Sequence, residues 1–221
     1  MPSVTVENYL KRLYLQQQAE PVDFVAIGKL ANAMGVVPGT ATSMVKALAE
    51  SGLVSYEPRG GVRLTRAGEQ LALHVLRRHR LVELFLVKVL GLDWSEVHVE
   101  AEELEHAISD KVLERIDALL EHPSVDPHGD PIPPAKGRLQ ATPPRATLAD
   151  CKPGQTYRIA RVIDQSAGFL QFIDRCGLIP GVAVSTEGRE EMADAIRVRT
   201  SGRDAITLGT AAANKIQVES P

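Results

Sequence analysis

The sequence predicts a mainly α-helical protein with a small β-barrel at its carboxyl end. Apolar residues recur at helical spacing through residues 1–122, and short β-prone runs follow in the last third of the chain. Between the two parts, seven of the 14 prolines gather in residues 123–144. Because such a stretch is typical of a stiff linker, we expect a linker over 123–145 and the β domain over 146–221.

Composition excludes several classes of protein. With 221 residues and 44% hydrophobic content the chain can bury a core, which excludes a disordered or fibrous protein. It has no run of about 18 apolar residues, and Met1–Tyr14 lacks the apolar centre of a signal peptide, so we expect a cytoplasmic protein without membrane contact. Cys151 and Cys176 stand alone, which argues against a disulfide framework or a thiolate zinc site. The net charge of −3 confines any nucleic-acid contact to a local patch.

Residues 1–51 predict three helices. Thr5 and Asp23 are candidate N-caps of the first two, Gly35 ends the second, and Pro38 stands in the first turn of the third. The apolar residues at helical spacing are Val6, Leu10, Leu13, Tyr14, Phe24, Ile27, Leu30, Met34, Met44, Val45 and Leu48. A hairpin follows, in which the β-prone runs 53–57 and 62–64 flank a Pro-Arg-Gly-Gly tip. Helix, tight turn, helix and hairpin together predict a winged helix-turn-helix over residues 1–65.

Further helices extend this module. The helical pattern continues from Thr65 to Leu90, and we expect two more helices, over 93 to about 108 and over 110–120. Such appended helices commonly build a dimer interface, so residues 66–122 are expected to form a dimerisation domain. Beyond the linker, the expected strands are 156–163, 182–186, 196–200, 205–208 and 215–218, with one helix at 168–175.

Two stretches without acidic residues carry the candidate DNA contacts. Residues 38–49, in the third helix, have one cation and small hydroxyl residues at their start, and residues 58–66 carry Arg59, Arg63 and Arg66. Cations contact phosphates, and short side chains let a helix approach base edges closely. The predicted DNA-binding residues are Pro38, Gly39, Thr40, Thr42, Ser43, Lys46 and Arg59. The alternative is an amphipathic helix and a solvated hairpin that bind another protein.

Imidazoles and carboxylates recur at helical spacing in the next helices. His79 and Glu83 are four residues apart, and a second helix carries His98, Glu102, Glu105 and His106, expected on one face. Packed together, these residues could ligate one or two divalent cations. The alternative is a set of capped or surface histidines and an ordinary charged face.

Catalytic motifs are missing from the sequence. A ferritin-like di-metal site needs paired Glu-x-x-His repeats, and only Glu103-x-x-His106 occurs. There is no Ser/His/Asp elbow, phosphate-binding glycine loop or HExxH motif. We therefore do not expect an enzyme.

Five segments together resemble the DtxR/MntR family of metal-dependent transcriptional repressors. They are TVENYL (5–10), HRLVE (79–83), HVEA (98–101), EHAIS (105–109) and DPHGDPIP (126–133). The resemblance covers nearly the whole chain. It implies a winged-helix DNA-binding domain, a helical domain for dimerisation and metal binding, and a carboxyl-terminal SH3-like (FeoA-like) domain.

The resemblance also implies two metal sites. By position, the regulatory site consists of Asn8, Glu102, Glu105 and His106. Iron-responsive relatives place cysteine at the position of Glu102, and manganese-responsive ones place acids at the positions of Asn8 and Lys11. The ancillary site of the iron-type proteins is matched by His79, Glu83 and His98, with Gln165 and Gly168 at the positions that complete it from the SH3-like domain.

These observations favour a homodimeric transcriptional regulator that binds operator DNA when metal is bound and controls metal-ion homeostasis genes. Mn²⁺ is the preferred metal because three oxygen-bearing side chains and one imidazole form an oxygen-rich site. Fe²⁺ is the second candidate, and Zn²⁺ or Cd²⁺ could occupy the sites. The alternatives are a winged-helix regulator with a purely structural metal and a carboxylate-histidine metalloenzyme.

Overall fold

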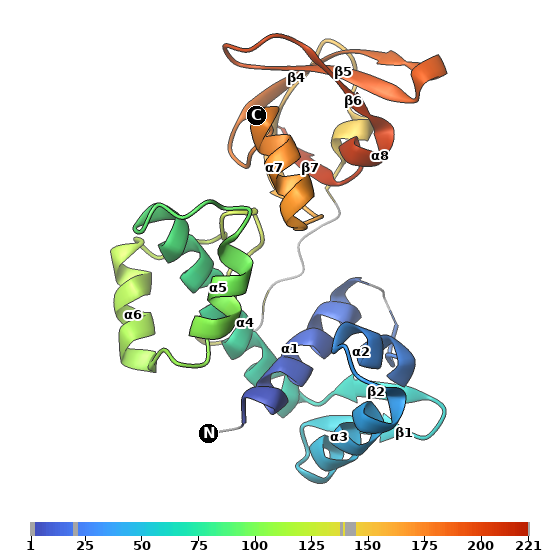
Figure 1. Cartoon of the computed structure of the whole chain (residues 1–221), viewed down its shortest axis with the longest axis vertical. Helices are drawn as coiled ribbons and strands as arrows, with labels where there is room; N and C mark the ends of the chain where they lie inside the picture. Colours follow the sequence, from blue (N-terminus) through green and yellow to red (C-terminus); the bar gives the residue numbers. More distant parts are fainter. Residues whose placement is uncertain (1–2, 20–21, 138, 140–144, 221) are drawn as a thin grey trace. The chain divides into compact units, whose positions relative to one another are not determined.

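The computed structural model describes residues 3–19, 22–137, 139 and 145–220 (Figure 1). The chain divides into two compact units. The first consists of Met1–His79, Leu104–Asp110 and Pro133–Leu139, and the second of Arg80–Glu103, Lys111–Ile132 and Gln140–Pro221. Within the described residues, no helix is both long enough and apolar enough to cross a bilayer.

The first unit contains the predicted winged helix-turn-helix. Its elements are α1 (Val4–Ala19), α2 (Ile27–Ala33), α3 (Pro38–Glu50), β1 (Val54–Glu57), β2 (Gly61–Leu64) and the start of α4 (Arg66–Lys88). Strands β1 and β2 are antiparallel, with Val54 opposite Leu64. Leu10, Leu30 and Val45 are buried in a shared apolar core, which fixes α1, α2 and α3 against one another.

The start of α2 differs from the prediction. Asp23 is not its N-cap, because the helix begins at Ile27 after Ala26, which makes no side-chain cap hydrogen bond. Val25 instead pairs with Val62 of β2, through N–H···O=C bonds of 2.8 and 2.9 Å in the two directions. This tertiary pairing holds the chain extended where the apolar spacing alone favours helix.

The second unit holds the carboxyl-terminal part of α4 and most of α5 (Val97–Leu104) and α6 (Asp110–Leu119). Helix α5 is shorter than the predicted helix from 93 to about 108. At its start, the Asp93 carboxylate accepts hydrogen bonds from the backbone N–H and the hydroxyl of Ser95, which forms a separate turn. At its end, the chain turns after Leu104.

A five-stranded antiparallel sheet forms the carboxyl-terminal part of the second unit. Its strands are β3 (Thr156–Val162), β4 (Ala183–Glu190), β5 (Ala195–Thr200), β6 (Ile206–Gly209) and β7 (Ile216–Glu219), in the order β6-β5-β4-β3-β7. Helix α7 (Ala167–Arg175) buries Leu170 and Ile173 in the core that the sheet forms. The sequence did not predict α8 (Thr210–Ala213) or the short 3-10 turns η1 (Leu148–Asp150) and η2 (Glu191–Ala193).

The first half of the proline-rich segment packs against β3. The Val162 N–H donates to the His128 carbonyl at 2.9 Å. Gly129 has a φ of +86°, and a Cβ atom there would lie 2.1 Å from the Ala160 carbonyl oxygen. Only glycine permits this approach, so the DPHGDP motif is folded structure and places His128 inside the second unit.

Candidate metal centres and DNA-binding face

Glu105 is the centre of a buried polar cluster in the first unit, which we call the Glu105 cluster: Glu7, Asn8, Lys11, His79, Glu105 and His106. Glu105 has no exposed surface. Its Oε1 lies 2.6 Å from Lys11 Nζ and 3.1 Å from His106 Nε2, and its Oε2 lies 2.6 Å from His79 Nδ1. The carboxylate therefore has three positively charged or hydrogen-bonding neighbours.

Both nitrogens of His106 have partners in this cluster. Nδ1 lies 2.6 Å from Glu7 Oε2, and Nε2 lies 2.9 Å from Asn8 Oδ1. Glu7 and Asn8 are neighbours on α1, while His106 follows the end of α5 nearly 100 positions later. The structure thus brings together Asn8, Glu105 and His106, three of the four residues predicted for the regulatory site.

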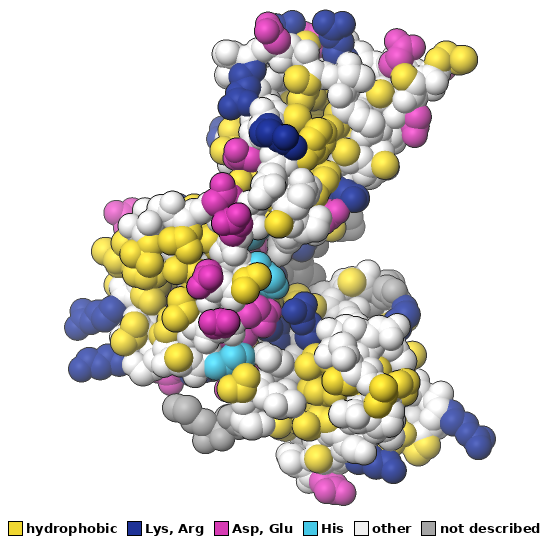
Figure 2. Space-filling view, in the orientation of Figure 1, with side chains coloured by type: hydrophobic (Ala, Val, Ile, Leu, Met, Phe, Trp, Pro, Cys, Tyr) yellow, Lys and Arg dark blue, Asp and Glu magenta, His cyan; other side chains and the backbone are white. Residues whose placement is uncertain are grey.

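Glu102, the fourth, contacts His98, whose Nε2 lies 3.5 Å from Glu102 Oε1. The prediction that His98, Glu102, Glu105 and His106 share one helix face is wrong, because α5 ends at Leu104. The turn that follows directs Glu105 toward Lys11 in the first unit instead. In Figure 2, carboxylate and imidazole side chains gather on the face over α5.

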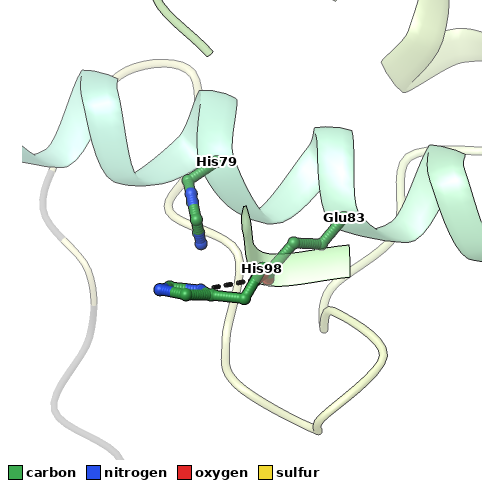
Figure 3. A group of neighbouring side chains, drawn as sticks. All are labelled: His79, Glu83 and His98. Carbon is green, nitrogen blue, oxygen red and sulfur yellow. Dashed lines mark hydrogen bonds and ion pairs between the residues drawn. The ribbon is translucent and has the colours of Figure 1, made fainter. Parts of the chain in front are cut away.

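The predicted ancillary residues are also brought together. His79 and Glu83 lie one turn apart on α4, and His98 approaches them from α5 (Figure 3). The three residues offer ligand atoms within 4.8 Å of one another, and His98 Nδ1 lies 3.2 Å from Glu83 Oε1. Two imidazoles and a carboxylate are suitable ligands for a divalent cation.

A second group, Glu83, Asp126 and His128, was missed by the sequence analysis. These residues are buried, and their ligand atoms again lie within 4.8 Å of one another. His128 Nε2 lies 2.9 Å from the Trp94 carbonyl oxygen, which can only accept, so Nε2 carries the proton. In the neutral ring Nδ1 then presents a lone pair. Nδ1 has no hydrogen-bond partner among the described residues and lies 3.9 Å from Glu83 Oε2.

The electrostatics of this group fit a cation. Burial, followed by the nearby carboxylates of Asp130 and Glu83, raises the pKa of Asp126 well above its ordinary value. A cation among these groups would reduce the repulsion between the carboxylates and would give the buried Nδ1 of His128 a partner. The sequence carries this signal in the DPHGDP motif, where an acidic residue and a histidine lie two positions apart.

The predicted DNA-binding residues lie on the winged helix-turn-helix. Pro38, Gly39, Thr40, Ser43 and Lys46 are exposed on α3, whereas Thr42 is half-buried. The Thr42 and Ser43 hydroxyls donate to the carbonyls of Pro38 and Gly39, at 2.8 and 3.1 Å. Arg59 is exposed at the tip of the hairpin with a φ of +69°.

Comparison with known proteins identifies the family. Three family models match the chain: the N-terminal DNA binding domain of iron dependent repressors over residues 1–62, their metal binding and dimerisation domain over 65–134, and the FeoA domain over 146–220. An HTH-type transcriptional regulator of Methanocaldococcus jannaschii is 39% identical over 121 residues, which are 54% of this chain and 94% of that protein. The chain belongs to the DtxR/MntR family of metal-dependent repressors.

Relatives that match along the full chain support the same assignment. The iron-dependent repressor IdeR of Mycobacterium bovis is 28% identical over 226 residues, 97% of this chain and 96% of that one. The solved structure of a manganese-dependent transcriptional repressor in complex with manganese has a TM-score of 0.83 and 41% identity, covering 98% of this chain and 100% of that one. ScaR with bound Zn²⁺ has a TM-score of 0.75 and 34% identity, covering 100% of both chains. This repressor is therefore a metal-responsive DNA-binding regulator and not a metalloenzyme.

Gln165, proposed to complete the ancillary site, has a different partner in this repressor. Its Nε2 donates to Asp130 Oδ2 at 2.5 Å, and Arg161 contacts the other oxygen of the same carboxylate. Gly168, in the first turn of α7, offers no side-chain ligand. The described residues thus place Asp126 and His128 beside Glu83, while Gln165 contacts Asp130.

Proposed function

We propose that this chain is a Mn²⁺-activated repressor that binds operator DNA as a homodimer in the cytoplasm and controls metal-ion homeostasis genes. The observation that carries the proposal is the convergence of Asn8 Oδ1 and Glu105 Oε1 on His106 Nε2, at 2.9 and 3.1 Å. Oxygen-rich ligand sets suit Mn²⁺, and Glu102 adds a further carboxylate by its position in the family motif. Fe²⁺ is the second candidate, because the IdeR relatives are named as iron-dependent.

The residues of this regulatory site connect the DNA-binding module with the chain that follows α5. Asn8 lies on α1, which packs with α2 and α3 in one core. A bound divalent cation supplies two positive charges that favour one arrangement of these carboxylate, amide and imidazole ligands. Because α1 carries Asn8, that preference acts on the position of α1, and so on the module that presents α3 to DNA.

A second cation is proposed at Glu83. This carboxylate belongs both to the group with His79 and His98 and to the group with Asp126 and His128. The unpartnered Nδ1 of His128 favours the second group. Zn²⁺ or Cd²⁺ could occupy either site, and solved structures of ScaR are described with each of these ions.

For DNA, we propose that the exposed face of α3 enters the major groove and that Arg59 contacts the backbone or the minor groove. Thr40, Ser43 and Lys46 lie on that face, and the partly buried Thr42 borders it. A homodimer presents two such helices, and a two-fold operator requires them about 34 Å apart, one DNA turn.

The test is DNA binding with and without metal. The probe is a DNA site selected from a random pool by Mn²⁺-loaded protein. We expect operator affinity to rise with Mn²⁺ and fall with chelator, and His106→Ala to fold and dimerise but lose the metal response. His122→Ala is the control, because His122 is exposed and lies 2.9 Å from Asp117, outside the Glu105 cluster. A wild-type protein that binds metal without a change in DNA affinity would favour the structural-metal alternative.

A further inference from the structure

Glu7 was assigned no role in the sequence analysis, yet it is buried against a predicted metal ligand. Its side chain is 8% exposed, and that of His106 is 9% exposed. Resting on the proposed function, we infer that Glu7 is a positioning residue of the regulatory site. It holds His106 Nδ1–H and thereby directs Nε2 toward Asn8 and Glu105, where the cation binds.

The hydrogen-bond pattern supports this role. A carboxylate only accepts hydrogen bonds, so the 2.6 Å contact between Glu7 Oε2 and His106 Nδ1 requires the proton on Nδ1. In the neutral ring, Nε2 then presents a lone pair toward Asn8 Oδ1 and Glu105 Oε1. A lone pair facing two oxygens is repulsive, and a cation among the three atoms makes the arrangement attractive. Carboxylates that hold the second nitrogen of a ligand histidine are a general feature of metal sites.

Glu7 is itself held in place. Arg78 Nη1 lies 3.9 Å from Glu7 Oε1, and Arg78 Nη2 donates to Asp110 Oδ1 at 2.8 Å. Glu7 also lies in the first turn of α1, where an acidic side chain is stabilised by the helix dipole. Because Glu7 and Asn8 are adjacent on this helix, a displacement of α1 would remove a ligand and the group that orients His106 together.

The experiment compares Glu7→Gln and Glu7→Ala with wild type by Mn²⁺ titration of the full-length protein. Gln keeps an acceptor for Nδ1–H but loses the charge, whereas Ala loses both. We expect Mn²⁺ affinity to fall by about 10-fold in Glu7→Gln and by up to about 100-fold in Glu7→Ala. The matched control is Glu100→Gln, which removes an exposed carboxylate from α5 and should leave affinity unchanged.

A spectroscopic measurement separates positioning from a structural effect. With diamagnetic Zn²⁺ bound, the His106 Nδ1–H should give a slowly exchanging proton signal in ¹⁵N-edited NMR spectra, assigned by its loss in His106→Gln. We expect the signal in wild type and Glu7→Gln and its loss in Glu7→Ala.

Three outcomes would overturn the inference. Glu7→Gln and Glu7→Ala could both bind Mn²⁺ within twofold of wild type. The Nδ1–H signal could persist in a folded Glu7→Ala. The loss of Mn²⁺ affinity in Glu7→Gln could be accompanied by a fall in the urea midpoint of the metal-free protein, which would indicate a loss of stability and not of positioning. If the DNA affinity of the wild-type protein does not change with Mn²⁺, the proposed function is refuted instead. The wild-type DNA affinity with and without Mn²⁺ is therefore measured before any variant is compared.

Discussion

Lys11→Met tests whether Lys11 acts as a built-in cation for Glu105. Lys11 is 2% exposed and Glu105 0%, with Nζ and Oε1 2.6 Å apart. At an effective dielectric constant of about 20, this attraction is on the order of 6 kcal/mol. His79 remains 2.6 Å from the other carboxylate oxygen and offsets part of the loss. We therefore expect the metal-free variant to be less stable by about 3 kcal/mol, the lower end of the range for breaking a buried ion pair.

Metal should reverse this loss if Glu105 is a ligand. In the variant, a divalent cation supplies the positive charge that Lys11 provides to the Glu105 carboxylate in the wild type. If the cation recovers the whole 3 kcal/mol or so, Mn²⁺ affinity rises by about 100-fold, at roughly 1.4 kcal/mol for each tenfold change. The assay is urea unfolding followed by circular dichroism, with and without Mn²⁺, together with Mn²⁺ titration at constant ionic strength.

Lys152→Met is the control, because Lys152 is exposed and lies outside the Glu105 cluster. It should change neither the metal-free stability nor the Mn²⁺ affinity. If Lys11→Met lowers stability but leaves Mn²⁺ affinity as in wild type, Glu105 is not a ligand of the ion. If stability is also unchanged, the ion pair makes no net contribution, and the reasoning from burial fails.

Three further predictions concern the second cation, the hairpin and the choice of metal. His128→Gln removes the lone pair beside Glu83, so equilibrium dialysis against Mn²⁺ should show one ion fewer per chain; an unchanged count would place the second ion elsewhere. Arg59→Ala should weaken binding to all DNA sequences alike and reduce the slope of log affinity against log salt by about one unit, and an unchanged slope would remove the hairpin from the interface. Glu102→Cys should shift activation from Mn²⁺ toward Fe²⁺ or Zn²⁺, because a thiolate suits those ions better; an unchanged metal ranking in the DNA-binding assay would show that Glu102 does not set selectivity.

The sequence predicted those elements whose signals are local. Helix α3 begins at Pro38 as expected, and α4 follows a long apolar stripe. The errors occur where distant contacts decide the conformation. Because Val25 pairs with Val62, α2 begins later in the chain than predicted. Helix α8 has four residues, too few to show a helical period in the sequence.

The candidate site was predictable by family motif more than by spacing. The resemblance placed Asn8 with Glu105 and His106, although 97 positions separate Asn8 from Glu105 and no local rule connects them. Spacing alone placed Glu105 on the same helix face as His98, and the end of α5 at Leu104 makes that wrong. Neither approach indicated Glu7. A residue that orients a metal ligand from a distant segment has no characteristic spacing in the sequence, and only the fold shows that its carboxylate contacts the imidazole.

The charge balance of the first unit bears on what the metal does. The two buried carboxylates of the Glu105 cluster, Glu7 and Glu105, lie beside two buried cations, Arg78 and Lys11. The adjoining core of α1, α2 and α3 is apolar and independent of these groups. A purely structural metal is required where ligand charges have no other compensation and the core is too small to fold alone, as in zinc fingers. Here both carboxylates lie beside buried cations and the adjoining core is apolar, so we expect this unit to fold without the cation. We therefore expect the free energy of metal binding to favour one arrangement of α1, as the proposed function requires.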